Sequence, residues 1–492
     1  MRRELPRFSA AILLLGLPLP AWPHAFGERY ELPAPLGYFV AGAAAAVALS
    51  FVVAAVFMRG MPREHPAKHF VVPLGPVLQP LRAVCRVISV VLLCMVVVAG
   101  LFGTRNPEMN LAPILVWIVW WVGLSFVVAC CGNIWPALDP WRAVFEWADK
   151  AARRLGFANG ISLNLAYPAW IGAWTSVFLL LLFVWIEVIY PQAAAPAHVA
   201  WMALVWSAIT LTGMVCFGGD TWRRNADVFA IYFSMLARFA PIDIGPDGRS
   251  IVLRPPGRGL ITAGAVPSGM VGFVIAMLST VMFDGLLGTQ AMALTQVALA
   301  DWMTLHPLAG GYSVGAAGII TMWLFFLLAY MLACRATARL VRDRTAGAIA
   351  RLFVLTLVPI AIAYNVAHYF HYLLVQGQLI IPLLSDPLGR RWDLFGTAMY
   401  YPDIGILDAR FIWYLAITCI VAGHVISIWL AHRLALREFR ARGTAVAASV
   451  PLTVLMVLYT VISLLIIADP LVQYNVPGKT SWPGAAAWMA WG

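Results

Sequence analysis

Long apolar segments alternate with short polar connections along almost the whole chain. Each segment runs for about 20 residues, the length that an α-helix needs to cross the hydrocarbon core of a bilayer. The fold class predicted is therefore all-α, a polytopic transmembrane helical bundle of about ten spans. The ten expected spans are Gly37–Met58, Ala83–Phe102, Leu111–Cys131, Ala169–Tyr190, His198–Phe217, Leu260–Phe283, Tyr312–Cys334, Leu352–Val375, Phe411–His432 and Ser449–Ala468.

The first 25 residues follow a different pattern. Arg2, Arg3 and Arg7 precede a short apolar run, which ends in a proline-rich stretch before Ala25. A basic start, a short apolar region and a breaker-rich end are typical of a secretory signal peptide. We therefore expect residues 1–25 to be removed, which leaves residues 26–492 as the integral membrane domain with its N-terminus outside.

Basic residues are distributed unevenly between the connections. With the mature N-terminus outside, the inner connections hold 24 Lys and Arg residues and the outer segments hold six. An excess of basic residues in cytoplasmic loops is the signature that sets the orientation of membrane proteins. It predicts a multi-pass membrane protein, with both the mature N-terminus and the C-terminus on the periplasmic or exterior side.

Composition excludes the main soluble classes. Of the 492 residues, 62% are hydrophobic and 11% are charged, whereas soluble domains carry about 25% charged residues. A soluble enzyme, a nucleic-acid-binding protein and a disordered scaffold are therefore excluded. The net charge of +11 is explained by the inner connections, so we expect the lipid bilayer and no nucleic acid as partner. The chain contains neither GxxxxGK[ST] nor CxxCH, which argues against ATP-driven transport by this chain alone and against c-type haem.

The span Leu352–Val375 carries an unusual group of polar residues. His368 and His371 are three residues apart and share one helix face, and Asn365 lies one turn earlier on that face. At 1.5 Å per residue, His368 is expected roughly 12 Å below the outer boundary of the membrane. A charged group in the hydrocarbon costs several kcal/mol, so ionisable residues inside spans are the first candidates for function.

Three other spans offer polar partners to this face. Asp284 and Glu187 lie near the outer ends of their spans, and His424 is expected roughly 20 Å below the outer boundary. Two histidines on one turn and a carboxylate from another helix fit a zinc, manganese or iron site. We therefore predict a divalent metal of unidentified kind, with ligands from the set His368, His371, Asp284 and Glu187. Histidines held only by hydrogen bonds, simple interfacial carboxylates and, with less support, a haem ligated by His368 and His424 remain alternatives.

The outer loop 376–410 is the longest exterior segment, and it directly follows the histidine pair. Long loops beside a site commonly carry function, so a lid or a substrate entrance is one interpretation. A folded surface loop with local Arg–Asp pairs is the other.

Two inner connections resemble each other. The first runs from Gly132 through Trp135 to Asp139, and the second from Gly219 through Trp222 to Asp227. Each places a glycine, a polar residue and a tryptophan ahead of an amphipathic stretch. An old internal duplication explains the likeness, and so do two interfacial helices that are anchored by Trp and Arg.

Several motifs spread over nearly the whole chain resemble a bacterial membrane protein family that is commonly labelled fenitrothion hydrolase. They are HAFGERY at 24–30, FGGDTWR at 217–223, YNVAHY at 364–369, QGQ at 376–378, SDPLG at 385–389, WDLFG at 392–396 and GHV at 423–425. The resemblance implies hydrolysis of an organophosphorus triester such as fenitrothion, with release of a substituted nitrophenol. It carries over the matched positions Asn365, His368 and His424 as suspected site residues.

The expected function is therefore membrane-bound, metal-assisted hydrolysis of lipophilic organophosphorus triesters. The metal would activate a water molecule, and His424 and Asn365 would be catalytic residues, His424 as a further ligand or proton acceptor. The rival interpretation is a transporter or a membrane-complex subunit that uses the same His/Asp cluster to handle a metal or protons. The sequence leaves open the natural substrate and whether the chain acts as a homo- or hetero-oligomer.

Overall fold

A computed structural model describes residues 30–58, 70–245, 249–262, 264–305, 311–439 and 441–473. The predicted signal peptide, residues 1–25, and the C-terminal residues 474–492 lie outside the described residues.

Helices dominate the fold, and the strands are short. The α-helices are α1 Leu36–Phe57, α2 Gly75–Phe102, α3 Leu111–Pro113, α4 Leu124–Cys131, α5 Trp135–Leu138, α6 Pro140–Arg154, α7 Trp174–Val188, α8 Pro196–Phe217, α9 Gly219–Asn225, α10 Val228–Ala237, α11 Arg258–Ile261, α12 Ser268–Leu287, α13 Gln290–Leu305, α14 Gly311–Val341, α15 Ala346–Phe353, α16 Val358–Gln376, α17 Ile380–Ser385, α18 Ala409–Glu438 and α19 Arg442–Leu471. The remaining elements are the 3₁₀-helices η2 Pro107–Met109, η4 Val354–Leu357 and η5 Gly377–Leu379, the π-helix η3 Ile114–Gly123, and the strands β1 Tyr30–Glu31, β2 Phe70–Pro73, β3 Ile242–Ile244, β4 Ser250–Leu253 and β5 Val472–Gln473.

The protein is a multi-pass helical bundle, as the apolar pattern predicts. In the described ranges, nine helical segments are long and apolar enough to cross a membrane. The remaining predicted span, Ala169–Tyr190, is represented by the 15-residue helix α7. The first residues of the predicted span, 169–173, form turns instead of helix. Gly172 among them has a φ of +48°, a left-handed conformation that interrupts a right-handed helix.

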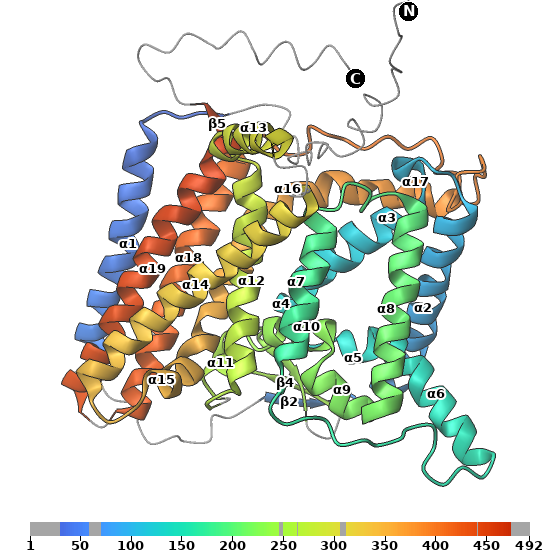
Figure 1. Cartoon of the computed structure of the whole chain (residues 1–492), viewed down its shortest axis with the longest axis horizontal. Helices are drawn as coiled ribbons and strands as arrows, with labels where there is room; N and C mark the ends of the chain where they lie inside the picture. The colour runs from blue at the N-terminus through green and yellow to red at the C-terminus, as the bar shows by residue number, and fades with distance from the viewer. Residues whose placement is uncertain are drawn as a thin grey trace, which may run out of the picture.

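The two ends of the bundle carry different elements (Figure 1). One end, called the sheet end below, carries β2, β4, α6 and α9, and the other, called the loop end, carries α13 and α17. The described parts of the connections predicted to be inner lie at the sheet end (Figure 1), so the alternating path of the chain agrees with the prediction. Which end faces the cytoplasm stays a prediction.

Helices α12 and α16 occupy the middle of the bundle. In each of their spans, 72% of the most apolar 18-residue stretch is buried, compared with 22% for α1 and for α2. The peripheral helices instead expose large apolar side chains such as Val56 and Val91, as expected of surfaces that face lipid. Polar residues on α12 and α16 are therefore shielded from the hydrocarbon by other helices.

The two similar connections fold in a similar way. Gly132 directly follows helix α4, and Gly218 directly follows helix α8. Their φ values are +88° and +87°. Left-handed backbone at a helix C-terminus favours glycine. A short helix, α5 or α9, follows in each case and carries the tryptophan.

The helices that follow these connections differ from each other. Helix α6 is amphipathic and partly exposed, as expected for an interfacial helix. Helix α10 is instead almost wholly buried, including Phe229, Tyr232 and Phe233. The interfacial interpretation is therefore wrong for α10, because this helix packs against α4 and α7 inside the bundle.

Short strands join distant parts of the chain at both ends. At the sheet end, β2, β4 and β3 form an antiparallel sheet in which Leu253 faces both Phe70 and Ile242. At the loop end, β1 pairs in parallel with β5, with Tyr30 opposite Val472. The hydropathy pattern did not predict these strands because each has only two to four residues.

The outer loop is a folded segment. Its first ten residues continue the helical path through η5 and α17. The side chain of Gln378 then accepts hydrogen bonds from the Tyr400 hydroxyl at 2.7 Å and from the Asp403 amide at 3.0 Å. Asp386 accepts bonds from the backbone of Arg390 and Arg391. These bonds favour the folded-loop interpretation, and a lid function stays a prediction.

Candidate functional site

An aspartate and a histidine from the two central helices meet in the half of the bundle nearest the loop end. Asp284 is on the last turn of α12, and His368 is on α16. The His368 Nε2 atom lies 3.0 Å from the Asp284 Oδ2 atom. The His368 side chain is 16% exposed and the Asp284 side chain is 17% exposed. The pair is therefore mostly buried but still accessible. Helix α12 can approach α16 closely here because the next residue is Gly285, where a Cβ would lie 2.4 Å from the Tyr364 hydroxyl.

Two tyrosines surround the Asp284–His368 pair. The Tyr369 hydroxyl donates a hydrogen bond to the same Asp284 Oδ2 atom. The Tyr369 ring meets the His368 imidazole edge-to-face, with centroids 4.6 Å apart, and the Tyr364 ring stacks at 6.2 Å. These contacts restrict the imidazole to one orientation, so the pair is preorganised.

The predicted residue Glu187 belongs to the same region. It lies on α7, close enough to interact electrostatically with Asp284, and Trp121 lies beside it. Trp121 also packs on Tyr232 of α10, with ring centroids 4.8 Å apart. The structure therefore brings three of the predicted residues, Glu187, Asp284 and His368, into one polar region.

Asn365 and His424 lie deeper in the bundle. Asn365 is buried and makes a long hydrogen bond of 3.5 Å to the Tyr232 hydroxyl. His424 is 1% exposed, and its Nδ1 donates to the backbone oxygen of Ile420 at 2.8 Å. The adjacent Gly423 packs on Ala363, five residues before His368 on α16. Five residues correspond to roughly 7.5 Å along a helix, so His424 lies about one and a half turns below His368.

The predicted metal site lacks a complete ligand set in the part of the chain that the structure describes. No group of three or more His, Cys, Asp or Glu side chains there could hold a metal ion. His371 is half-buried, one turn beyond His368 on α16, and the Asp284 Oδ2 atom is already engaged by His368 and Tyr369. A divalent metal therefore stays a prediction that requires a further donor.

Sequence reasoning missed two features of the site. Tyr232 was assigned no role, because its helix was not recognised as part of the bundle interior. The π-helix η3, which contributes Trp121, was also not predicted. Widened helical turns of this kind occur frequently at functional sites. The only signal was Pro113 directly before it, and proline is common where helical hydrogen bonding changes.

In this arrangement, the Asp284 carboxylate can hold a proton on His368 Nε2 and orient the ring. The lone pair is then on Nδ1, so the imidazole can act as a general base. No family model, curated protein or solved structure matches the chain. The resemblance to the fenitrothion hydrolase family therefore stays a prediction.

Proposed function

We propose that the protein is a hydrolase of lipophilic organophosphorus triesters, embedded in the bacterial inner membrane with its site in the periplasmic half. The observation that carries the proposal is the Asp284–His368 contact of 3.0 Å between two central helices. A carboxylate that orients a histidine is a recurring device for activating a nucleophile. The family resemblance supplies the substrate class.

The chemistry requires one proton transfer. His368 Nδ1 takes a proton from a water molecule, whose oxygen attacks phosphorus, and the aryloxide leaves as the phosphorus–oxygen bond to it breaks. Asp284 stabilises the imidazolium that forms. A nitrophenolate is a stable anion, so its departure needs no proton donor. None of these steps depends on the predicted metal.

The location of the pair suits an apolar substrate. A lipophilic triester partitions into the bilayer and can reach the site between helices, without crossing the aqueous phase. The aromatic rings of Tyr364 and Tyr369, which lie beside His368, offer an apolar surface to the aryl group. The proposed topology places both chain ends in the periplasm, on the same side as the site.

The test is release of nitrophenol from fenitrothion by membranes of a host that expresses the chain. Wild-type membranes should release it, and His368→Ala membranes should release it about 10²–10⁴-fold more slowly, the usual contribution of a general base. His198→Ala is the control, because His198 lies on α8 in ring contact with Tyr190. Equal release by wild type and His368→Ala would remove His368 from the mechanism, and no release by well-expressed wild type would contradict the hydrolase.

A second candidate is transport of protons or a metal through the same region. It is favoured by buried polar groups that continue below the site. In the described part of the bundle, His424 Nε2 and the hydroxyls of Ser427 and Ser463 have no hydrogen-bond partner. Transport predicts accumulation of the cargo in sealed vesicles without any product. Hydrolysis predicts product even in detergent solution.

A further inference from the structure

Two buried carboxyl groups at the sheet end have one oxygen each without a partner. Asp139 is 1% exposed and Asp227 is 3% exposed. Each caps a helix through its Oδ1 atom: Asp139 accepts from the Arg142 amide at 2.9 Å, and Asp227 from the Phe229 and Ala230 amides at 3.0 Å. Among the described residues, neither Oδ2 atom has a hydrogen-bond partner.

The same two connections each contribute a second buried polar group, the indole N–H of a tryptophan. Trp135 precedes Asp139 by four residues, and Trp222 precedes Asp227 by five. These indoles are 2% and 7% exposed. Neither indole N–H has a partner in the described ranges. A buried polar group without a partner costs free energy, so four such atoms in two matching connections indicate a site.

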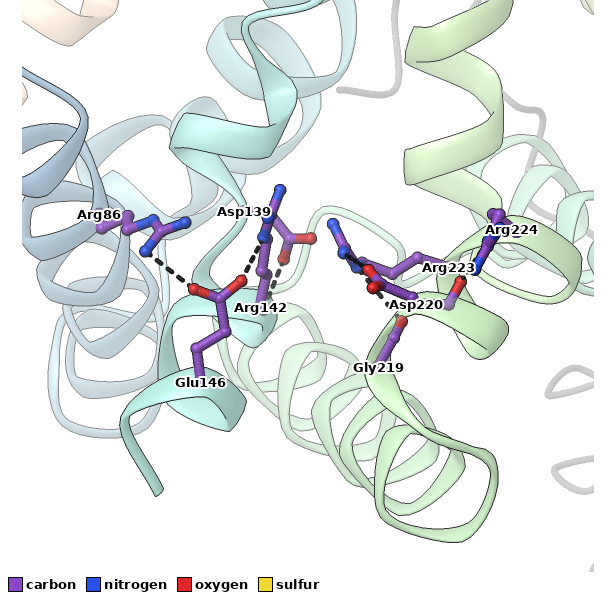
Figure 2. A network of polar contacts seen from close by, with 8 residues as sticks. All are labelled: Arg86, Asp139, Arg142, Glu146, Gly219, Asp220, Arg223 and Arg224. Atoms are coloured by element: carbon purple, nitrogen blue, oxygen red, sulfur yellow. Dashed lines mark hydrogen bonds and ion pairs between the residues drawn. The ribbon is translucent and has the colours of Figure 1, made fainter. Parts of the chain in front are cut away.

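The arginines drawn around Asp139 in Figure 2 are paired with other carboxylates or bonded to backbone. Glu146 on α6 pairs with Arg86 of α2 at 2.9 Å and with Arg142 at 2.6 Å. Arg223 of α9 pairs with Asp220. Figure 2 shows the Arg223 side chain reaching toward Asp139, and it interacts with both buried carboxyls only at longer range. Among the described residues, therefore, neither aspartate forms an ion pair.

We propose that Asp139 and Asp227 form a proton-binding site between the first turns of α6 and α10, which keeps one of the two carboxyls protonated at mildly acidic pH. Trp141 and Phe229, each two residues beyond one of these aspartates, stack with ring centroids 5.9 Å apart, so α6 and α10 begin side by side. Two carboxylates that lie near each other in a buried region resist ionising together. The proton relieves this repulsion, while the Oδ1 atoms continue to cap both helices. The proposal does not depend on the hydrolase activity, because the site lies at the opposite end of the bundle.

Electrostatics supports the proposal. Burial, followed by the neighbouring Asp227 carboxylate, raises the pKa of Asp139 to about 7. Burial also raises the pKa of Asp227. Two kinds of group lower these pKa values. They are the backbone amides that donate to the Oδ1 atoms, and the positive charges of Arg142 and Arg223. Helices α4, α5 and α10 contribute no Asp, Glu, Lys, Arg or His, so burial and the neighbouring carboxyl are the main causes that raise these pKa values.

The sign of the pH dependence follows from the raised pKa. Between about pH 5 and pH 7 the folded protein holds a proton that an unfolded aspartate, with a pKa near 3.9, has lost. One such proton lowers the ratio of folded to unfolded protein about tenfold for each pH unit of increase, and the effect levels off above the folded pKa.

The test is thermal unfolding of the purified full chain in detergent across this pH range, for wild type, Asp139→Asn and Asp227→Asn. Asparagine retains the capping oxygen, so both variants should fold. Each should show a weaker decline than the wild type, because the remaining carboxyl loses its neighbour but stays buried. The double variant Asp139→Asn/Asp227→Asn should show no such decline. Asp149→Asn is the control, because Asp149 is also on α6 but pairs with Arg153 at 2.9 Å, and it should keep the wild-type slope.

Two results would overturn the proposal. One is an identical pH slope in the wild type and both variants. The other is a slope that changes when sodium replaces potassium at constant ionic strength, which would make the occupant a metal cation. If a variant fails to fold, infrared difference spectra of the wild type still decide: a protonated carboxyl band must be present at pH 6 and vanish by about pH 8.

Discussion

Triester hydrolysis is expected to fall about 10²–10⁴-fold when Asp284 is replaced by asparagine, the range that positioned acid–base groups contribute. The amide has the shape of the carboxylate and can still accept the hydrogen bond from Tyr369. It has no negative charge, however, and so it cannot stabilise a protonated His368, whose Nε2 atom lies 3.0 Å from Asp284 Oδ2. The loss should appear in kcat, because the charge matters most in the transition state.

The control for this variant is Asp408→Asn. Asp408 also lies at the loop end, where it caps α18 by accepting from the Phe411 amide, and asparagine is an equally good cap. It should therefore keep full activity. An Asp284→Asn protein that hydrolyses fenitrothion at the wild-type rate would contradict the proposed role of the Asp284–His368 pair.

Replacing Gly423 by leucine should destabilise the protein by about 3 kcal/mol or more, at the upper end of the cost of overpacking a core. A Cβ at this position would lie 2.4 Å from the Ala363 Cβ atom and 2.9 Å from the Pro359 oxygen. Helices α16 and α18 would have to separate, and α16 carries His368. Both the unfolding temperature and the yield of folded protein in detergent should drop.

Gly42→Leu provides a matched substitution. Gly42 lies on α1, and a Cβ there would have no atom within 4 Å. Leucine at this position adds apolar surface to a peripheral helix, so stability should hardly change. Similar losses in both variants would show that the close approach of α16 to α18 is not what makes Gly423 sensitive.

The course of the chain through the membrane could be predicted well because it depends on local composition. The predicted span Leu111–Cys131 coincides with a span in the structure, and the spans that end at Phe102 and Phe217 end there as well. The π-helical geometry within the first of these could not be predicted, because hydropathy is the same for every type of helix. The buried position of α10 depends on which helices surround it, and that information is not local.

The candidate site was predicted in part. Depth along a helix can be counted from the sequence, which is why Asp284 and His368 were expected in the same half of the membrane. Their direct contact depends on small features of distant helices, such as the space that Gly285 leaves for the Tyr364 hydroxyl. The likeness of the two inner connections is visible in the sequence. The burial of Asp139 and Asp227 is not, because it depends on how distant helices pack around them.

The position of the first helix has a consequence for biosynthesis. Helix α1 packs against α18 and α19, through contacts such as Phe39 with Trp413. Both of these helices leave the ribosome long after α1. The nascent α1 must therefore wait in the lipid, without its final neighbours, until everything between Phe57 and Ala409 has been inserted. The β1–β5 pairing then joins the earliest and latest described segments, so the bundle closes only after β5 has been synthesised.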